Sequence, residues 1–321
     1  MIEHQPIPLK SIHYARERIK GLALRTPLVR LNLEDAPAEI FLKLENLQAV
    51  GSFKMRGAGN AILGADPQQL KQGVWTASAG NMAQAVAWFA NQSGIPCTVI
   101  VPDDAPEVKL AAIHRLNART VKVPFAEYQN IQREHNYSGM QGLLIHPFGD
   151  DVVMAGNATI GLEILEDLPT VDTILVPYGG GGLSCGIASA IKAVNPKIKV
   201  YAVEVATATP LASSLSAGEP VEVPFSSSFV SGMGAPFVFP EMWPLASRLL
   251  DGSLVVEIAQ VVSSIKLMAE RLHIIVEGAG AVALAAALAG KAGQSKIACL
   301  VSGGNLAPEI FIKILQGELP L

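Results

Sequence analysis

The sequence predicts an α/β protein with mainly parallel sheets. Short runs rich in β-branched residues recur along the 321-residue chain, and segments with helical periodicity lie between most of them. Parallel strands need crossover connections, which such helices provide. A chain of this length exceeds the usual size of a single hydrophobic core, so two domains are expected.

Each predicted element follows from a local pattern. The predicted strands are short runs rich in Val, Ile and Thr, at residues 40–44, 74–77, 98–101, 120–123, 143–145, 173–176, 199–203 and 297–301. The predicted helices have apolar residues at helical spacing and include residues 81–92, 107–116, 158–167 and 183–193. Residues 220–244 lack periodicity and contain several Pro and Gly, which predicts an irregular loop, either functional or simply a solvent-exposed connection.

Composition predicts a compact soluble protein whose partner is a small molecule. Half of the residues are hydrophobic, 16% are charged, and the formal net charge is −4 with both signs interspersed. This pattern offers no basic stripe for nucleic acid and no polybasic membrane patch. The start, MIEHQPIPLK, has no apolar h-region and no apolar run is long enough to span a bilayer, so a cytoplasmic location is expected.

The spacing of cysteine and histidine argues against disulfides and transition metals. Cys97, Cys185 and Cys299 are far apart and form no CxxC, and the six histidines show no HxxxH or HExxH spacing. We interpret the three cysteines as small buried hydrophobic residues.

Four polar turns that contain glycine follow or adjoin predicted strand ends. They surround Lys54 in GSFKMRGA and comprise the runs SAGN at 78–81, GGGG at 179–182 and SGGN at 302–305. In open α/β sheets, ligands bind at the carboxyl ends of the strands. The four turns therefore predict one shared crevice.

The tetraglycine predicts a phosphate site. It follows the apolar run TILVPY and precedes the helical segment LSCGIASAIKAV, so that backbone N–H groups and a helix N-terminus converge on an anion. The alternative is a tight turn that merely packs the helix on the strand. No Lys follows as in a P-loop, and Cys185 stands where a dinucleotide fingerprint has its third glycine, so a single phosphate monoester is favoured.

A lysine framed by glycine and a phosphate pocket in one chain suggest pyridoxal phosphate held as a Schiff base. Such chemistry needs a nucleophilic amine that later acts as a base, together with an anchor for the phosphate. Taken alone, Lys54 would be interpreted as a solvated charge; beside the other turns it becomes the best candidate in the chain.

At these motifs the chain resembles the fold-type II pyridoxal-phosphate enzymes, in the branch of threonine and serine dehydratases and serine racemases. The resemblance runs from RTPLVRL through LKLENLQAVGSFKMRGA, SAGN, PFGDDVVMAGNATIGLEIL and VPYGGGGLSCGIA to EGAGA and VSGGN. It implies a tryptophan synthase β-like fold with two open, twisted, mainly parallel sheets flanked by helices. It also implies a large cofactor-binding domain (residues 1–72 and 150–321), a small mobile substrate-loop domain (73–149) and a homodimer.

The resemblance implies a role for each motif residue. Lys54 would bind the cofactor covalently and serve as the catalytic base, Phe53 would pack on the cofactor ring, and Asn81 would bond its 3-hydroxyl oxygen. The substrate carboxylate would lie at the turn formed by Ser78, Ala79, Gly80, Asn81 and Met82. The phosphate would be held by Gly179, Gly180, Gly181, Gly182 and Leu183, and the pyridine nitrogen would face Ser302.

Ser302 and Ala79 set the expected reaction. A hydroxyl such as that of Ser302 cannot fully protonate the pyridine nitrogen, which favours β-elimination: Lys54 removes the Cα proton, the β-hydroxyl leaves, and hydrolysis gives a 2-oxo acid and ammonia. Racemases of this branch carry a second serine where this chain has Ala79, so a dehydratase is favoured over a racemase. A β-replacement synthase and a non-catalytic cofactor-binding protein are also less favoured than a dehydratase.

Three further residues have two interpretations each. Glu204 and Ala208 match part of the branch's cation site, but Pro210 replaces an expected acid, so cation binding stays uncertain and Glu204 as a helix-capping acid is equally consistent. Glu277 is interpreted as an acid at a helix N-terminus rather than a group that orients the cofactor or water. Arg56 is interpreted as one half of a surface salt bridge rather than a phosphate ligand.

Overall fold

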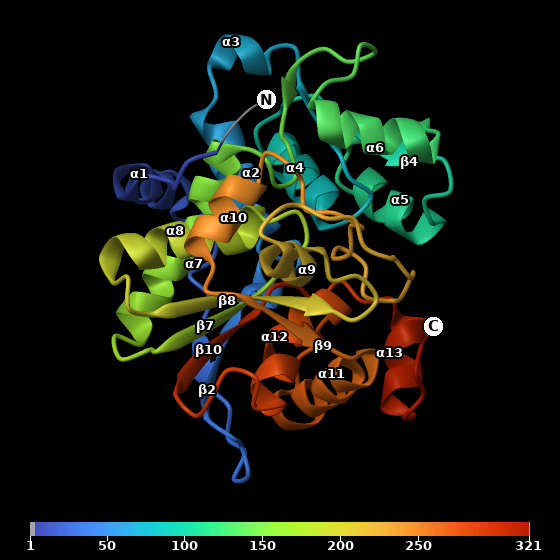
Figure 1. Cartoon of the computed structure of the whole chain (residues 1–321). Coiled ribbons are helices and arrows are strands. Elements are labelled where there is room, and N and C mark those ends of the chain that lie inside the picture. Colours follow the sequence, from blue (N-terminus) through green and yellow to red (C-terminus); the bar gives the residue numbers. More distant parts are fainter. Residues whose placement is uncertain (1–3, 321) are drawn as a thin grey trace.

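The computed structural model describes residues 4–320, so the first three residues and the last residue of the predicted large domain lie outside it. The chain forms two separate sheets, which occupy opposite ends of the molecule in Figure 1. The cyan and green helices surround the smaller sheet, and the blue, olive and red segments build the larger one.

The larger sheet has six strands in the order β1-β2-β10-β7-β8-β9, all parallel except for the antiparallel edge pair β1 and β2. Its strands are β1 (Leu28–Arg30), β2 (Glu39–Leu44), β7 (Thr173–Pro177), β8 (Lys199–Val205), β9 (Ser253–Val256) and β10 (Lys296–Val301).

The smaller sheet has four parallel strands in the order β5-β4-β3-β6. They are β3 (Val74–Ala77), β4 (Cys97–Pro102), β5 (Arg119–Val123) and β6 (Leu143–Leu144). All four strands fall inside the predicted small domain; the division into domains itself stays a prediction.

Helices connect the strands and cover both faces of each sheet. They are α1 (Leu9–Ile19), the 3₁₀ turn η1 (Glu45–Leu47), α2 (Lys54–Gly64), α3 (Pro67–Leu70), α4 (Asn81–Gln92), α5 (Glu107–His114), α6 (Phe125–Glu134), α7 (Asp151–Asp167), α8 (Gly182–Val194), α9 (Pro210–Ala217), α10 (Trp243–Leu249), α11 (Ile258–Leu272), α12 (Gly278–Leu288) and α13 (Pro308–Leu315).

The strand predictions are confirmed, and the structure adds β1 and β9, which the sequence pattern did not indicate. Helix α7 begins seven residues earlier than predicted, at Asp151. Its N-cap Asp150 accepts hydrogen bonds from the N–H groups of Val152 and Val153, which fixes the helix start. Residues 220–240 form no helix or strand, as predicted, but α10 begins at Trp243 inside the predicted loop.

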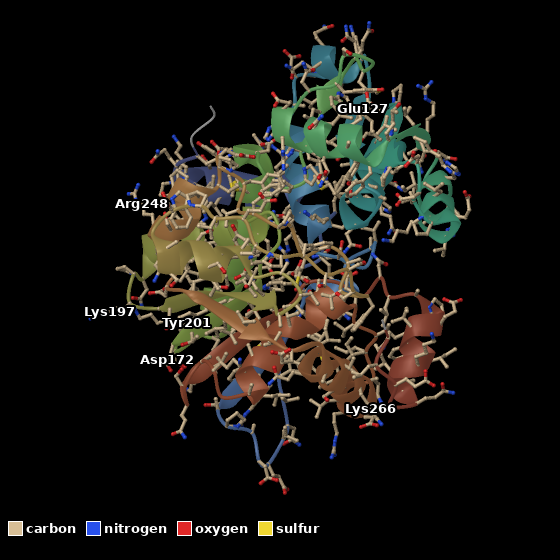
Figure 2. All side chains as sticks on the ribbon, turned by 45° about the vertical axis from the view of Figure 1, so that its right-hand side comes forward. Glu127, Asp172, Lys197, Tyr201, Arg248 and Lys266 are labelled. Carbon is tan, nitrogen blue, oxygen red and sulfur yellow. The ribbon has the colours of Figure 1, made fainter. Side chains whose placement is uncertain are left out.

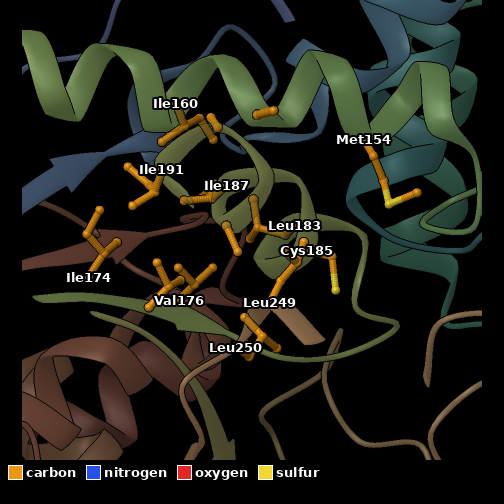
Figure 3. Close-up of a cluster of buried hydrophobic side chains, with 14 of the residues drawn as sticks. Met154, Ile160, Ile174, Val176, Leu183, Cys185, Ile187, Ile191, Leu249 and Leu250 are labelled. Atoms are coloured by element: carbon orange, nitrogen blue, oxygen red, sulfur yellow. The ribbon is translucent and has the colours of Figure 1, made fainter. Parts of the chain in front are cut away.

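The core of the larger unit lies on both faces of its sheet. Helices α1, α7, α8 and α10 cover one face, and α11, α12 and α13 cover the other. Figure 3 shows side chains of α7 and α8 meeting above Ile174 and Val176 of β7. Leu175, between these two residues, points to the opposite cluster, as the alternation of a strand requires. The sheet thereby holds α8 rigidly at the end of β7.

The surface carries charges of both signs on both units. Glu127 lies at the small-sheet end in Figure 2 and Lys266 at the opposite end, with Asp172, Lys197 and Arg248 between them. The three cysteines are buried, as predicted, and burial raises the thiol pKa of Cys97 and of Cys185 to about 12. Within residues 4–320, no helix combines the length and apolar character needed to cross a bilayer.

Candidate active site

A cavity of about 460 Å³ lies between segments of the two sheets. All the residues predicted for cofactor and substrate line it: Phe53, Lys54, Ser78, Ala79, Gly80, Asn81, Met82, Gly179, Gly180, Gly181, Gly182, Leu183 and Ser302. The predicted crevice therefore exists, and the four glycine-containing turns contribute to it. The roles assigned to the individual residues stay predictions.

Lys54 is the first residue of α2 and reaches into this cavity. Its Nζ donates a hydrogen bond to the carbonyl oxygen of Pro147 at 2.6 Å and lies 4.9 Å from the centre of the Phe53 ring. Burial lowers the pKa of the Lys54 amine to about 8, against the attraction of Glu277, which raises it. More of this amine than of an ordinary lysine is therefore neutral and nucleophilic near neutral pH.

The glycine turn at the end of β7 presents unpaired backbone N–H groups to the cavity. Gly181 is the N-cap of α8 and has a φ of +89°, a conformation that glycine adopts without strain. Within the described chain, the amides of residues 179–184 donate to no protein acceptor. Because α8 spans 13 residues, its N-terminus adds a partial positive charge, so this turn can bind an anion.

Sterics explain the glycines of this turn as fully as anion binding does. A Cβ at Gly180 would lie 2.3 Å from the Phe148 ring, and one at Gly182 would lie 2.4 Å from the Phe148 carbonyl oxygen. At Gly179 it would lie 2.8 Å from the carbonyl oxygen of Gly232. The turn is thus packed closely against the segment that also holds the Lys54 amine through Pro147.

The SAGN turn at the end of β3 forms a second site with free N–H groups. The Ser78 hydroxyl accepts a hydrogen bond from the Gly80 N–H at 3.2 Å, and α4 begins at Asn81. In the described structure, the N–H groups of residues 81–83 have no protein acceptor. This helix N-terminus, on the small-sheet side of the cavity, can bind a carboxylate.

A hydrogen-bonded chain of three side chains ties the two sides of the cavity together. The Asn81 Nδ2 donates to Glu277 Oε1 at 2.8 Å, and its Oδ1 accepts from Asn305 Nδ2 at 2.8 Å. Asn305 also donates to the carbonyl oxygen of Val50 at 2.8 Å. With both side-chain atoms occupied, Asn81 is held in one orientation.

Glu277 lies at a helix N-terminus, as its sequence suggested, and its side chain makes a contact inside the cavity that the sequence did not indicate. It is the N-cap residue of α12, but its side chain caps no helical N–H and binds Asn81 in the cavity instead. Burial raises the pKa of its carboxyl to about 7, although the Asn81 hydrogen bond and the positive charges of Lys109 and Lys54 act in the opposite direction. Glu277 can thus hold or release a proton near neutral pH.

Ser302 directly follows strand β10 and lines the cavity. Its side chain is 3% exposed, and its carbonyl oxygen accepts a hydrogen bond from the Phe53 N–H at 3.0 Å. Ser52 and Gly303 form an antiparallel β-bridge at the same place, which joins the segment before Lys54 to the segment that follows β10. The Ser302 hydroxyl and the Lys54 amine are consequently fixed relative to each other.

Glu204 and Ala208 lie outside this cavity, around a small void of about 10 Å³. The Glu204 carboxylate accepts the N–H groups of Leu211 and Ala212 at 2.8 Å each and the Ser253 hydroxyl at 2.6 Å. Its oxygens thus stabilise the N-terminus of α9. No cluster of three or more His, Cys, Asp or Glu suited to a metal occurs within residues 4–320. The capping interpretation accounts for Glu204, and its part in a cation site stays a prediction.

Arg56 does not lie at the surface, and it does not line the cavity. It is 1% exposed and donates two hydrogen bonds each to Glu45 and Glu163, at 2.6–2.9 Å. Lys43 also contacts Glu163, with its Nζ 2.6 Å from Oε2. The surface interpretation was wrong because the carboxylates of Glu45 and Glu163, which lie 11 and 107 positions away in sequence, meet Arg56 inside the protein.

Sequence reasoning missed several residues that line the cavity. On the small-sheet side they are Gln84, Lys109, Tyr128 and Gln132, and Phe148 and Phe239 line other walls. Residues 231–235 of the irregular loop also contribute, which favours a functional loop over a simple connection. A helical periodicity plot would have placed Gln84 on the same face as Asn81, three residues earlier; the others have no local signal.

Comparisons with known proteins support a common family. The family model described as "Pyridoxal-phosphate dependent enzyme" matches residues 19–303. An L-threonine ammonia-lyase from Geobacter sulfurreducens is 38% identical over 323 residues, covering 98% of this chain and 79% of that protein. A serine racemase from Oryza sativa subsp. indica is 36% identical over 310 residues, covering 93% of this chain and 91% of that protein. The structure of maize serine racemase has a TM-score of 0.87 at 34% identity and covers 98% of both chains.

Proposed function

Because the chain belongs to the pyridoxal-phosphate-dependent enzymes, we propose that it is an ammonia-lyase that dehydrates and deaminates a β-hydroxy amino acid such as threonine or serine. The products are a 2-oxo acid and ammonia. One observation carries the proposal: the Lys54 amine, with its pKa lowered to about 8, lies in the same cavity as the two unpaired helix N-termini.

The residues of the cavity fit pyridoxal phosphate. The free N–H groups of residues 179–184 offer donors for a phosphate, and the Lys54 amine offers a nucleophile for the aldehyde. Ser302 offers a hydroxyl, which can hydrogen-bond a pyridine nitrogen without protonating it. When bound, the cofactor supplies an aldehyde that condenses with amines and a ring that accepts electrons from the Cα–H bond.

The protein's own groups then position the substrate and move its protons. The N-terminus of α4 binds the α-carboxylate, which fixes the Cα–H bond relative to Lys54. The Lys54 amine would act as the base that removes the Cα proton. The low polarity of the cavity lowers its pKa to about 8, which increases the neutral fraction that this step needs. The Glu277–Asn81–Asn305 chain links the α4 turn to the larger unit.

A racemase is the alternative function. The alanine at position 79 favours an ammonia-lyase over a racemase. Inversion at Cα by two bases requires a proton donor on the face opposite Lys54. Residue 79 of the SAGN turn lines the cavity but carries only a methyl group. Serine racemases are nevertheless among the similar proteins, so the assay must detect both reactions.

The test is a product assay on the purified, cofactor-loaded protein. We expect L-threonine or L-serine to release a 2-oxo acid and ammonia in equal amounts, with no accumulation of the D-isomer. Lys54→Ala should lose both the activity and the absorbance band of the covalently bound cofactor, whereas Lys71→Ala, at an exposed lysine, should keep both. Racemisation without 2-oxo acid would replace the proposal by the alternative, and absence of any bound cofactor would refute both.

The assembly and location are part of the same proposal. The family resemblance supports a cytoplasmic homodimer that acts on a small amino acid. Light scattering coupled to size-exclusion chromatography would give twice the 33.8 kDa chain mass for a dimer. A monomeric mass at micromolar concentration would contradict it.

A further inference from the structure

The carbonyl oxygen of Ala77, at the end of β3, lies where the ladder between β3 and β6 is interrupted. Along β6 and the residue that follows it, alternate N–H groups donate to the carbonyl oxygens of Gly73 and Trp75, at 3.0 and 2.8 Å. The next bond of this parallel ladder would start at residue 147, which is a proline without an N–H group. Ala77 is buried, so its carbonyl oxygen needs a donor from another element.

Two side chains of α6 supply that donor. The Tyr128 hydroxyl donates to the Ala77 carbonyl oxygen at 3.4 Å, a long hydrogen bond, and Gln132 Nε2 donates to the same oxygen at 3.2 Å. Gln132 Nε2 also donates to the Tyr128 hydroxyl oxygen at 3.0 Å. The two residues are four positions apart, which places them on one face of α6, and both line the cavity. Tyr128 and Gln132 therefore replace the ladder bond that Pro147 cannot donate.

Tyr128 also lies against the SAGN turn. Burial raises the pKa of its hydroxyl to about 12, although hydrogen bonds from the Ala79 N–H and the Gln132 amide act in the opposite direction. The hydroxyl is thus protonated at neutral pH, and its single proton is directed to the Ala77 carbonyl oxygen. Tyr128 therefore contacts the backbone on both sides of Ser78 and acts on the turn rather than as a proton donor to a substrate.

The backbone of Gln132 connects α6 to the segment that holds the Lys54 amine. Its carbonyl oxygen lies 3.1 Å from His146 Nε2, and His146 Nδ1 accepts a hydrogen bond from the Gly149 N–H at 2.8 Å. Burial lowers the pKa of His146 to about 3, so the ring is neutral and these two partners assign its proton to Nε2. His146 directly precedes Pro147, whose carbonyl oxygen accepts the hydrogen bond from Lys54. Gln132 is thus bonded toward the SAGN turn and toward the acceptor of Lys54.

We propose that Tyr128 and Gln132 are positioning residues that hold the SAGN turn in the orientation in which the N-terminus of α4 binds a substrate carboxylate. This inference rests on the proposed function and adds two residues to it that act through the backbone of the turn. The N-cap residue Gly80 offers no side-chain cap, so the direction of the first N–H groups of α4 depends on what holds the turn. Hydrogen bonds weaken steeply when donor and acceptor are misaligned, so a turn that is free to tilt binds a carboxylate less tightly.

A purely structural role makes a different prediction. If Tyr128 and Gln132 only stabilised the smaller sheet, their loss would weaken the binding of every ligand that reacts in the cavity. If they position the turn, their loss weakens only ligands that carry a carboxylate.

The test compares glycine with methylamine, which differ only by the carboxylate. Both amines condense with the aldehyde of the bound cofactor, so the absorbance of the cofactor-loaded protein gives the Kd of each. In Tyr128→Phe, which keeps the ring, we expect the glycine Kd to rise roughly 3- to 10-fold and the methylamine Kd to change less than about twofold. Gln132→Met should have the same effect.

Two matched variants serve as controls. Tyr137→Phe and Gln129→Met change the same residue types in the smaller unit, outside the lining of the cavity, and should leave both Kd values unchanged. The double variant Tyr128→Phe and Gln132→Met should raise the glycine Kd by less than the product of the single effects, because the two side chains share the Ala77 acceptor.

The outcomes separate this inference from the proposed function. An unchanged glycine Kd in both single variants, equal rises for glycine and methylamine, or no glycine binding to the loaded wild type would overturn the inference. Release of a 2-oxo acid from L-serine or L-threonine by the wild type tests the proposed function independently. If no β-hydroxy amino acid is turned over, the proposed function fails, and the two Kd values still decide on Tyr128 and Gln132.

Discussion

At the scale of single residues, Lys54 shows how position creates chemistry. An ordinary lysine is almost entirely protonated at pH 7, with about 0.03% neutral amine, whereas a pKa of about 8 leaves roughly 9% neutral. The shift comes chiefly from desolvation in the cavity wall. The single hydrogen bond to Pro147 aims the amine without supplying a counter-charge.

This pKa predicts the pH dependence of cofactor capture by the cofactor-free protein. Only the neutral amine attacks an aldehyde, so the rate should rise about tenfold per pH unit below 8 and level off above it. Stopped-flow absorbance between pH 6 and 10 measures the profile. Glu277→Gln removes the attraction that raises this pKa, and the profile should move to lower pH. A plateau reached only above pH 10 would contradict the assigned pKa.

Ala79 leads to a prediction about stereochemistry. Ala79→Ser places a hydroxyl in the turn that lines the cavity, and racemisation of L-serine should rise roughly 10²-fold or more, the usual contribution of one acid–base group. Chiral chromatography of the remaining serine measures it. Ala111→Ser, on the exposed face of α5, serves as the control. No gain in D-serine would mean that the Ala79 methyl is not what suppresses inversion.

Residues that bear a local motif could be placed from the sequence, and residues that meet through the fold could not. The tetraglycine, the SAGN turn and Ser302 each follow a strand, and all of them line one cavity. Glu277 lies at a helix N-terminus, as predicted, but its contact with Asn81 could not be predicted because the two residues are 196 positions apart. Lys109 and Gln132 likewise reach the cavity from helices that carry no motif.

At the scale of elements, α2 shows why helix prediction is hardest beside the site. Its sequence, KMRGAGNAILG, contains three glycines, which disfavour a helix locally. A Cβ at Gly57 would lie 2.7 Å from Val153 on α7, and one at Gly59 would lie 2.4 Å from the Phe89 ring on α4. Close packing of α2 therefore requires glycines, and these same glycines make the helix hard to predict from the sequence. The strand β1 was missed for a simpler reason: it has three residues and partial exposure.

The buried charges around Arg56 predict how firmly α2 is held. Lys43, Glu45, Arg56 and Glu163 are at most 4% exposed and sum to zero charge. Glu163→Gln leaves an uncompensated buried cation and should lower the free energy of unfolding by about 3–5 kcal/mol. Urea denaturation of the cofactor-free protein measures it.

A surface carboxylate on α7, the helix that also carries Glu163, provides the control. Glu166 binds Arg16 and Arg25 near the protein surface. Glu166→Gln should therefore cost less than about 1 kcal/mol. Comparable losses for the two substitutions would show that the buried cluster does not stabilise the helix beyond a surface pair.

At the scale of the whole molecule, the cavity is built from both sheets and belongs to neither. Helices α4, α5 and α6 line it from the smaller unit, and the ends of β7 and β10 line it from the larger one. A ligand that touches both walls should therefore stabilise the smaller unit as a body. We predict that residues 73–149 gain protection from hydrogen exchange together when cofactor and glycine bind, while α11 does not change. Exchange mass spectrometry measures this, and protection limited to residues 78–84 would contradict the predicted small domain.

The contact between Phe148 and the tetraglycine constrains the order in which mutations can accumulate. The atoms nearest to a Cβ at position 180 belong to the Phe148 ring, so a smaller residue at 148 must come first and the change at 180 second. A side chain at position 182 meets the backbone of Phe148, which no substitution at 148 removes. Position 180 can therefore accept a side chain only after residue 148 becomes smaller, whereas no substitution at residue 148 makes room for one at position 182.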